Sequence, residues 1–287
     1  MFTVDPQLVL EILLISIIAG VVGALFGLGG GILVIPFLTL VEGVPVQLAV
    51  GASIVSVVAT SSASAATYVK DHLTNLRLGM FLETGTVAGA LTGAFVASYF
   101  QGPNEWILYV LFGSMLFYAS TIMISGRRVD FPRGVTPDRL AKSLDLGGEY
   151  SDQSTGTHVK YAVTRTPHTL GISYLAGIVS GLLGVGGGII KVPTMNLVSK
   201  VPVKVASATS NFMIGITAAA SATIYFLRGD VHPLLTAPLM IGVVVGAAVG
   251  TRLLRRTPPT TIKILFAILL VFVALNMVFR GLSIQMG

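Results

Sequence analysis

The chain has 287 residues, of which 53% are hydrophobic and 10% are charged, and its mean hydropathy is +0.86. A soluble domain carries about 25% charged residues, so this composition indicates a membrane protein. The formal net charge of +6 fits basic loops that orient a chain in a bilayer, and we expect no nucleic-acid partner. The sequence has no cysteine, which excludes disulfides and thiolate metal sites.

Apolar runs that could span a lipid bilayer recur along the whole chain. About 20 apolar residues cross the hydrocarbon core as a helix, whereas the strands of a transmembrane barrel would alternate apolar and polar residues. We therefore expect an all-α polytopic membrane protein. The runs are Leu8 to Gly27, Val46 to Val69, Gly79 to Phe100, Trp106 to Ser125, Leu170 to Gly184, Val203 to Leu227, Leu234 to Leu254 and Ile264 to Phe279.

The first run ends at the segment GLGGGILVIP, which contains Gly29, Gly30 and Gly31. Each glycine in a helix interior costs about 1 kcal/mol relative to alanine, so the segment predicts a helix break and a new helix that starts near Ile32. Irregular backbone at membrane depth must be buried in protein or line a cavity. Because the free amides of a first helical turn attract anions, we expect these four residues to bind an anionic substrate. Close helix packing is the alternative role for the glycines.

The second half of the chain repeats the first. At an offset of 157, which aligns Gly27 with Gly184, 13 of the 27 positions from Gly27 to Ser53 are identical. The second copy reads GVGGGIIKVP and predicts a second break, with the same substrate-binding role, at Gly186, Gly187, Gly188 and Ile189. We therefore expect two membrane repeats, over residues 1–125 and 169–287.

Residues 126–168, between the repeats, are polar and rich in Gly, Ser, Thr and Pro, and predict an extramembrane linker. The basic loop residues change places between the halves, as inverted repeats and the positive-inside rule require. The linker then lies in the cytoplasm and both termini lie outside; the segments after the glycines either re-enter or cross the membrane. Eight parallel spans are the alternative. The predicted cytoplasmic loops contain Lys70 and Arg77 in the first half, and Lys200, Lys204 and Arg252 to Lys263 in the second.

One polar residue distinguishes the two breaks: Lys191 stands where the first repeat has Val34. A buried ammonium is costly, so Lys191 is a candidate substrate ligand, unless its side chain reaches a membrane interface. Glu83 lies near a predicted cytoplasmic helix end, where we expect it to be solvated; a proton carrier is the alternative. The helices after the breaks add the candidate ligands Ser53, Thr209, Ser210 and Asn211.

The duplicated pattern G-x-G-G-G-x-x-x-x-P, followed each time by V-P-V and a helix rich in Ala, Ser and Thr, resembles the sulfite exporter family of membrane permeases (the TauE/SafE type). The resemblance covers both membrane halves and not the linker. It implies a multi-pass protein of a prokaryotic plasma membrane that carries sulfite, sulfonates or related small anions. Together with the repeats, it predicts alternating access around a midplane site between the two glycine breaks. No oligomeric state is predicted.

Two other functions are alternatives to a transporter. An anion channel would conduct freely instead of exchanging its substrate. A membrane-embedded enzyme would need His, Asp or Glu clustered at membrane depth, but every histidine falls in a loop or in the linker. We therefore expect no catalytic residues, no metal and no cofactor. The histidines are His72, His158, His168 and His232.

Overall fold

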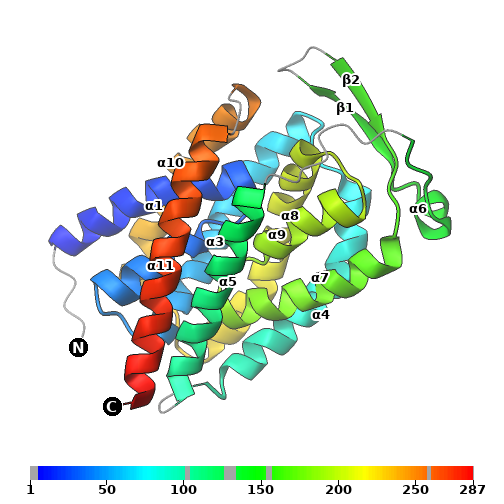
Figure 1. Ribbon diagram of the computed structural model, residues 1–287. Coiled ribbons are helices and arrows are strands. Elements are labelled where there is room, and N and C mark those ends of the chain that lie inside the picture. The colour runs from blue at the N-terminus through cyan, green and yellow to red at the C-terminus, as the bar shows by residue number, and fades with distance from the viewer. Residues whose placement is uncertain (1–5, 101–103, 126–133, 153–156, 257–259, 287) are drawn as a thin grey trace.

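The computed structural model describes residues 6–100, 104–125, 134–152, 157–256 and 260–286, and most of them are helical (Figure 1). Five helices in this described part of the chain, α1, α3, α4, α9 and α10, are long and apolar enough to cross a membrane. The prediction of an all-α polytopic membrane protein is therefore confirmed, with one small β-hairpin as an addition. The first half contains α1 (Pro6–Phe26), α2 (Gly31–Pro36), the π-helix η1 (Phe37–Val41), α3 (Val46–Lys70), α4 (Leu76–Ala97) and α5 (Glu105–Ser125).

The second half has the same succession of elements after the linker. Every predicted apolar run lies on one helix, and the two glycine segments fall between helices, as predicted. The elements are α7 (Thr166–Leu183), α8 (Gly188–Pro193), the π-helix η3 (Thr194–Val198), α9 (Val203–Leu227), α10 (Pro233–Arg256) and α11 (Thr260–Met286).

The two halves interlock instead of folding separately. The first long helix of each half packs against the helix before the last of the other half, so that α1 lies on α10 and α4 lies on α7. The central helices α3 and α9 pack against each other, and α5 runs beside α11 (Figure 1). Each half therefore supplies part of the packing surface that the other half needs.

Glycines at every fourth position bring α4 against α7 and α10 against α1. A Cβ atom added to Gly89 would lie 2.1 Å from the carbonyl oxygen of Tyr174, and one added to Gly246 would lie 2.0 Å from that of Ile17. Only glycine permits backbones to approach so closely, as in other small-residue helix crossings in membranes.

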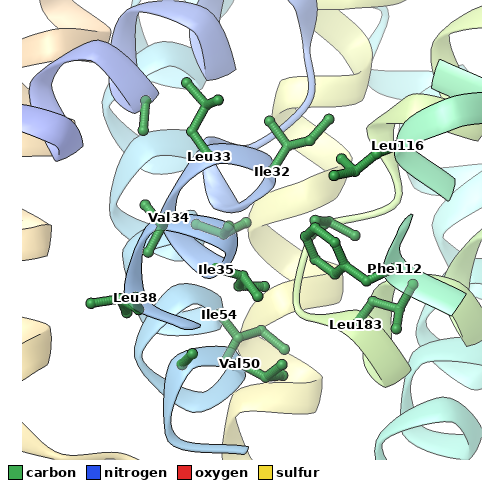
Figure 2. Packing of buried hydrophobic residues seen from close by; sticks show 14 of the residues in the cluster. Ile32, Leu33, Val34, Ile35, Leu38, Val50, Ile54, Phe112, Leu116 and Leu183 are labelled. Carbon is green, nitrogen blue, oxygen red and sulfur yellow. The ribbon is translucent and has the colours of Figure 1, made fainter. Parts of the chain in front are cut away.

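The short helix after the first break covers only the first part of α3. An added Cβ on Gly31 would lie 2.5 Å from the Ser53 hydroxyl and 3.3 Å from Val57. Gly31 therefore lies beside a point about three turns into α3. From there, α2 and η1 lead back to Val46, where α3 begins. The apolar side chains of α2 are fully enclosed, with Phe112 beside them. Figure 2 shows Ile32, Leu33, Val34 and Ile35 surrounded by residues of α3, α5 and α7.

The linker contains regular structure that the sequence did not predict. A short helix, α6 (Arg139–Ser143), is followed by an antiparallel hairpin of β1 (Gly148–Asp152) and β2 (Thr157–Tyr161), in which Tyr150 pairs with Val159. Residues 126–133 and 153–156 lie outside the described residues. Figure 1 shows the hairpin and α6 at one end of the molecule, away from the first turns of α1 and the last turns of α11.

Hydrogen bonds fix the linker to this end. The Asp138 side chain caps α6 by accepting from the Ala141 amide at 2.7 Å, and it also accepts from the Thr166 amide at 2.5 Å, which joins the linker to α7. Burial raises the pKa of Asp138, but the hydrogen bonds from Ala141 and Thr166 outweigh burial, so that the pKa lies below its usual value. The carboxylate is therefore ionised at neutral pH.

The turn between α3 and α4 forms the other anchor of the linker. The Asn75 side chain accepts from the Leu78 amide at 3.0 Å and donates to the Leu146 carbonyl at 2.8 Å and to the Tyr161 hydroxyl at 2.9 Å. Burial raises the pKa of Tyr161 to about 12, although the bond from Asn75 opposes this, so the phenol is neutral. The Thr164 amide donates to the Ser199 carbonyl at 3.3 Å, so the α3–α4 turn, the linker and the segment before α9 share one end.

Candidate functional site

The two glycine breaks meet in the interior of the molecule. A Cβ atom added to Gly31 would lie 2.6 Å from the carbonyl oxygen of Gly184, and one added to Gly188 would lie 1.8 Å from that of Gly27. The breaks therefore touch through their backbones. The structure brings together segments that the sequence places 157 residues apart.

The glycines at the breaks have conformations that favour glycine. The φ angles are 84° at Gly29, 72° at Gly30, 77° at Gly186 and 70° at Gly187, in the left-handed region that a Cβ atom disfavours. The helices therefore break where predicted. The packing role also holds, because an added Cβ on Gly187 would lie 2.7 Å from the carbonyl oxygen of Ala176 in the preceding helix.

Two predicted serine ligands join the repeats at the breaks. The Ser53 hydroxyl donates to the carbonyl oxygen of Gly184, and the Ser210 hydroxyl donates to that of Gly27, each at 3.0 Å. Each serine therefore donates to a carbonyl at the C-terminal end of the helix that precedes the glycine break of the other repeat. The hydroxyl protons are used, while the oxygens can still accept a hydrogen bond.

The remaining predicted ligands lie at different distances from the breaks. Asn211 donates to the Ala24 carbonyl at 3.1 Å, near the end of α1. Thr209 instead accepts from the Asn75 amide at 3.0 Å, at the α3–α4 turn. Ile32 and Ile189 are buried at the first turns of the short helices, where their backbone amides precede the first intrahelical bonds.

Lys191 is completely buried and lies within a polar cluster. Its Nζ donates to the Thr217 hydroxyl at 2.8 Å and lies 3.9 Å from Oε2 of Glu83. The side chain has 0% exposure, so Lys191 does not reach an interface. Its partners come from α9 of its own repeat and α4 of the other.

Glu83 is the functional candidate that the sequence analysis misplaced. We expected a solvated side chain, but its exposure is 6%. One carboxylate oxygen accepts from the Thr217 hydroxyl at 2.5 Å, and the other accepts from the Thr86 hydroxyl at 2.7 Å. A single carboxylate inside an apolar helix was the available signal, but its closeness to a predicted cytoplasmic helix end favoured a solvated side chain.

This charged cluster breaks the symmetry of the repeats. At the offset of 157, Lys191 corresponds to Val34, Thr217 corresponds to Thr60, and Glu83 corresponds to Met240. Val34 is fully buried among apolar residues. The equivalent position of the first repeat is therefore apolar, so the fold of the repeat does not by itself require a charge there.

No group of three or more His, Cys, Asp or Glu side chains that could hold a metal ion occurs in the described residues. The breaks and the charged cluster present several groups that can form hydrogen bonds or ion pairs. They offer backbone amides, hydroxyls, one ammonium and one carboxylate, all enclosed by helices from both repeats.

Comparisons with known proteins identify relatives over nearly the whole chain. The probable membrane transporter YunE of Bacillus subtilis is 26% identical over 279 residues, which cover 94% of this chain and 97% of the relative. The probable membrane transporter MJ0441 of Methanocaldococcus jannaschii is 29% identical over 217 residues, which cover 72% of this chain and 68% of the relative.

A longer relative contains a region of the same kind. The probable membrane transporter MamO of Paramagnetospirillum magneticum is 24% identical over 289 residues, which cover 94% of this chain but only 44% of that protein. No solved structure matches this chain. The model of the sulfite exporter TauE/SafE family matches residues 12–277. With its two glycine-broken repeats and apolar helices, the chain thus belongs to the TauE/SafE family of membrane transporters.

Proposed function

We propose that the protein is a secondary transporter of small anions, such as sulfite, sulfonates and related sulfur compounds, in a prokaryotic plasma membrane. The observation that carries the proposal is the meeting of two helix breaks in the interior, next to a fully buried lysine. Free amides and an ammonium are groups that bind oxyanions. The sulfur chemistry follows from the family to which the chain belongs.

An inverted arrangement of the repeats is part of the proposal. The α3–α4 turn, the linker and the segment before α9 share one end of the structure. Eight parallel spans would put the segment before α9 on the opposite side of the membrane from the other two. The end of α10 belongs to the same group, because Gly250 packs on α1 between Val21 and Ala24, and Tyr68, near the end of α3, donates to the Ala24 carbonyl. These contacts support inversion.

Transport in this arrangement requires the two breaks to separate. Backbone contact between them, and the serine bonds from each repeat to the other, close the centre in the structure. A movement that separates the breaks would expose the break amides and Lys191 to one side at a time, as alternating access demands. The proposed anion ligands are the backbones of Gly29 to Ile32 and Gly186 to Ile189, with Lys191, Ser53, Thr209, Ser210 and Asn211.

Binding is tested first by thermal unfolding of the purified protein with sulfite, methanesulfonate, sulfoacetate, sulfate, thiosulfate or acetate. A ligand at 100 times its Kd stabilises the folded state by about 2.7 kcal/mol. We expect a sulfur oxyanion to raise the unfolding temperature of the wild type and of the surface variant Lys142→Met. The double variant Lys191→Met/Glu83→Gln, which keeps the buried cluster electrically balanced, should lose the shift.

Counterflow in proteoliposomes separates a carrier from a channel. Unlabelled anion inside should drive uptake of labelled anion against its gradient, because a carrier exchanges its substrate. Free conductance without counterflow would exclude alternating access. If none of the sulfur oxyanions is bound or exchanged, the proposed function is wrong.

A further inference from the structure

The cluster of Glu83, Thr217 and Lys191 holds a carboxylate and an ammonium that share one hydroxyl. We propose that it is a proton-coupling site, in which Glu83 binds one proton for each anion that Lys191 takes up. The proton site rests on the proposed anion transport, and it adds an energy source that neither the family nor the relatives specify.

The ammonium is available to a second anion. Nζ lies 3.9 Å from the Glu83 carboxylate, beyond direct hydrogen-bond distance, and the described contacts include one donation from Nζ, to Thr217. An ammonium has three donors. The Thr217 hydroxyl therefore acts as a spacer between Lys191 and Glu83, and the cation can turn toward an arriving oxyanion without a large movement.

The balance of charge then couples the anion to a proton. In the empty site, the ammonium and the carboxylate neutralise each other. A bound monoanion adds a second negative charge to an enclosed site with one cation, and two neighbouring anions in such a site favour protonation of the weaker acid. With Glu83 protonated, the loaded site is again neutral. Both the empty and the fully loaded forms can therefore reorient without burying an unpaired charge.

Other charged groups on the surrounding helices do not supply this compensation. Lys191 is the charged residue of α8, and Thr86 is the further side-chain ligand of Glu83. The remaining charged or titratable residues described on α4, α7 and α9 are directed elsewhere. They are Arg77, which pairs with Asp145 at the surface, the exposed His168 and Tyr174, Lys204 in the first turn of α9, and Tyr225, which donates to the Gly181 carbonyl.

The two repeats differ at the positions of the charged pair, which limits the number of proton sites. The first repeat has Val34 and the second has Met240 where the cluster has Lys191 and Glu83. Only one copy of the pair exists, so we infer one proton for each transport cycle. In each cycle a hydronium ion on one side of the membrane gives a proton to the Glu83 carboxylate and becomes water, and on the other side the new O–H bond breaks and water takes the proton.

Methanesulfonate is the probe that exposes this coupling, because its sulfonate remains ionised at neutral pH and cannot carry the proton itself. Proteoliposomes of wild-type protein receive labelled methanesulfonate with a gradient of one pH unit. An electroneutral symport of one proton and one monoanion predicts about tenfold accumulation on the alkaline side, since one pH unit corresponds to a factor of ten. An entrapped pH indicator should report one proton per anion, and valinomycin with potassium should not change the accumulation.

The variant Glu83→Gln keeps the shape and the hydrogen-bonding ability of the side chain but cannot take up the proton. We expect its gradient-driven accumulation to fall to a ratio near one, while labelled methanesulfonate still exchanges, at a reduced rate, when the pH is equal on both sides. The matched control Glu105→Gln removes a carboxylate from the first turn of α5, and it should retain the tenfold accumulation.

The outcomes distinguish the proton site from anion transport. Wild-type exchange of methanesulfonate that ignores the pH gradient, or follows a sodium gradient, would overturn the proton site and leave the proposed function standing. Full gradient response in a folded Glu83→Gln variant would also overturn it. If that variant does not fold, the wild-type proton count decides alone. Absence of exchange of methanesulfonate, sulfite and sulfoacetate by the wild type would overturn both proposals.

Discussion

Lys191 shows how far a single residue's role depends on partners from other parts of the chain. Its spacing after the glycines predicts a buried cation near a helix break, and burial is what the structure shows. The partners Glu83 and Thr217 lie on α4 and α9, and tertiary packing alone brings them to the ammonium. The sequence therefore predicts the charge that needs compensation but not the group that provides it.

Replacing Lys191 with methionine tests the energetic dependence of the pair. The single variant leaves Glu83 as a buried, uncompensated carboxylate, and removal of one partner of a buried ion pair costs about 3–5 kcal/mol. The double variant Lys191→Met/Glu83→Gln removes both charges and should recover most of this loss. Unfolding of the purified proteins in mixed micelles, followed by circular dichroism, measures the difference.

A surface variant controls for loss of a lysine in general. Lys142 is exposed on α6, and Lys142→Met should change the free energy of unfolding by less than about 0.5 kcal/mol. Equal stability of the Lys191→Met variant and its double variant would show that Glu83 does not depend on Lys191.

At the scale of elements, the glycine breaks combine the two roles that the sequence left open. Gly27 has a left-handed conformation directly after α1, and Gly29 and Gly30 have left-handed conformations before α2, whereas Gly31 and Gly188 permit backbone contact between the repeats. Three consecutive glycines predict the break because each disfavours a helix. Which carbonyl faces which glycine could not be predicted, since it depends on how α3 and α9 cross.

The linker illustrates a different limit of prediction. Its polar composition predicts that residues 126–168 lie outside the apolar runs, but it gives no period from which a two-stranded hairpin could be expected. Asn75 and Asp138 order this segment by capping α4 and α6 and by bonding to Leu146 and Thr166. Such order comes from a few long-range polar bonds, which a single sequence does not reveal.

Substitution of Gly188 with alanine tests the contact between the breaks. The new Cβ would lie 1.8 Å from the carbonyl oxygen of Gly27, so backbone must move, and we expect a loss of about 3 kcal/mol in the free energy of unfolding. The matched change Gly171→Ala in α7 meets no atom within 4 Å and should stabilise the helix by about 0.5–1 kcal/mol. Thermal unfolding of both variants gives the comparison, and a Gly188→Ala variant as stable as Gly171→Ala would contradict the observed contact.

At the scale of the whole molecule, the first long helix of each half packs against a helix of the other half. This packing supports the proposed inversion. Parallel packing of α4 on α7 and of α10 on α1 follows from the glycine contacts, in which Gly89 and Gly93 meet Tyr174 and Ile178 in the same order. The loop charges suggested inversion because basic residues changed sides between the repeats. Residues 1–5, at the N-terminus expected outside, and residues 257–259, in a predicted cytoplasmic loop, lie outside the described residues, so exposed described residues are better probes of the orientation.

Single cysteines can report the orientation because the chain has none of its own. The exposed residues Leu76, Glu149, Arg252 and Gln285 are each replaced by cysteine and treated with a membrane-impermeant maleimide in intact cells and in lysed cells. Inverted repeats place the first three in the cytoplasm, so that only Gln285→Cys is labelled in intact cells. Eight parallel spans would put position 252 on the side opposite to 76, 149 and 285. Labelling of positions 252 and 76 from different sides of the membrane would therefore refute inversion. Labelling of position 285 from the side opposite to the other three positions would establish it, because an odd number of crossings in each half moves the C-terminus away from the linker.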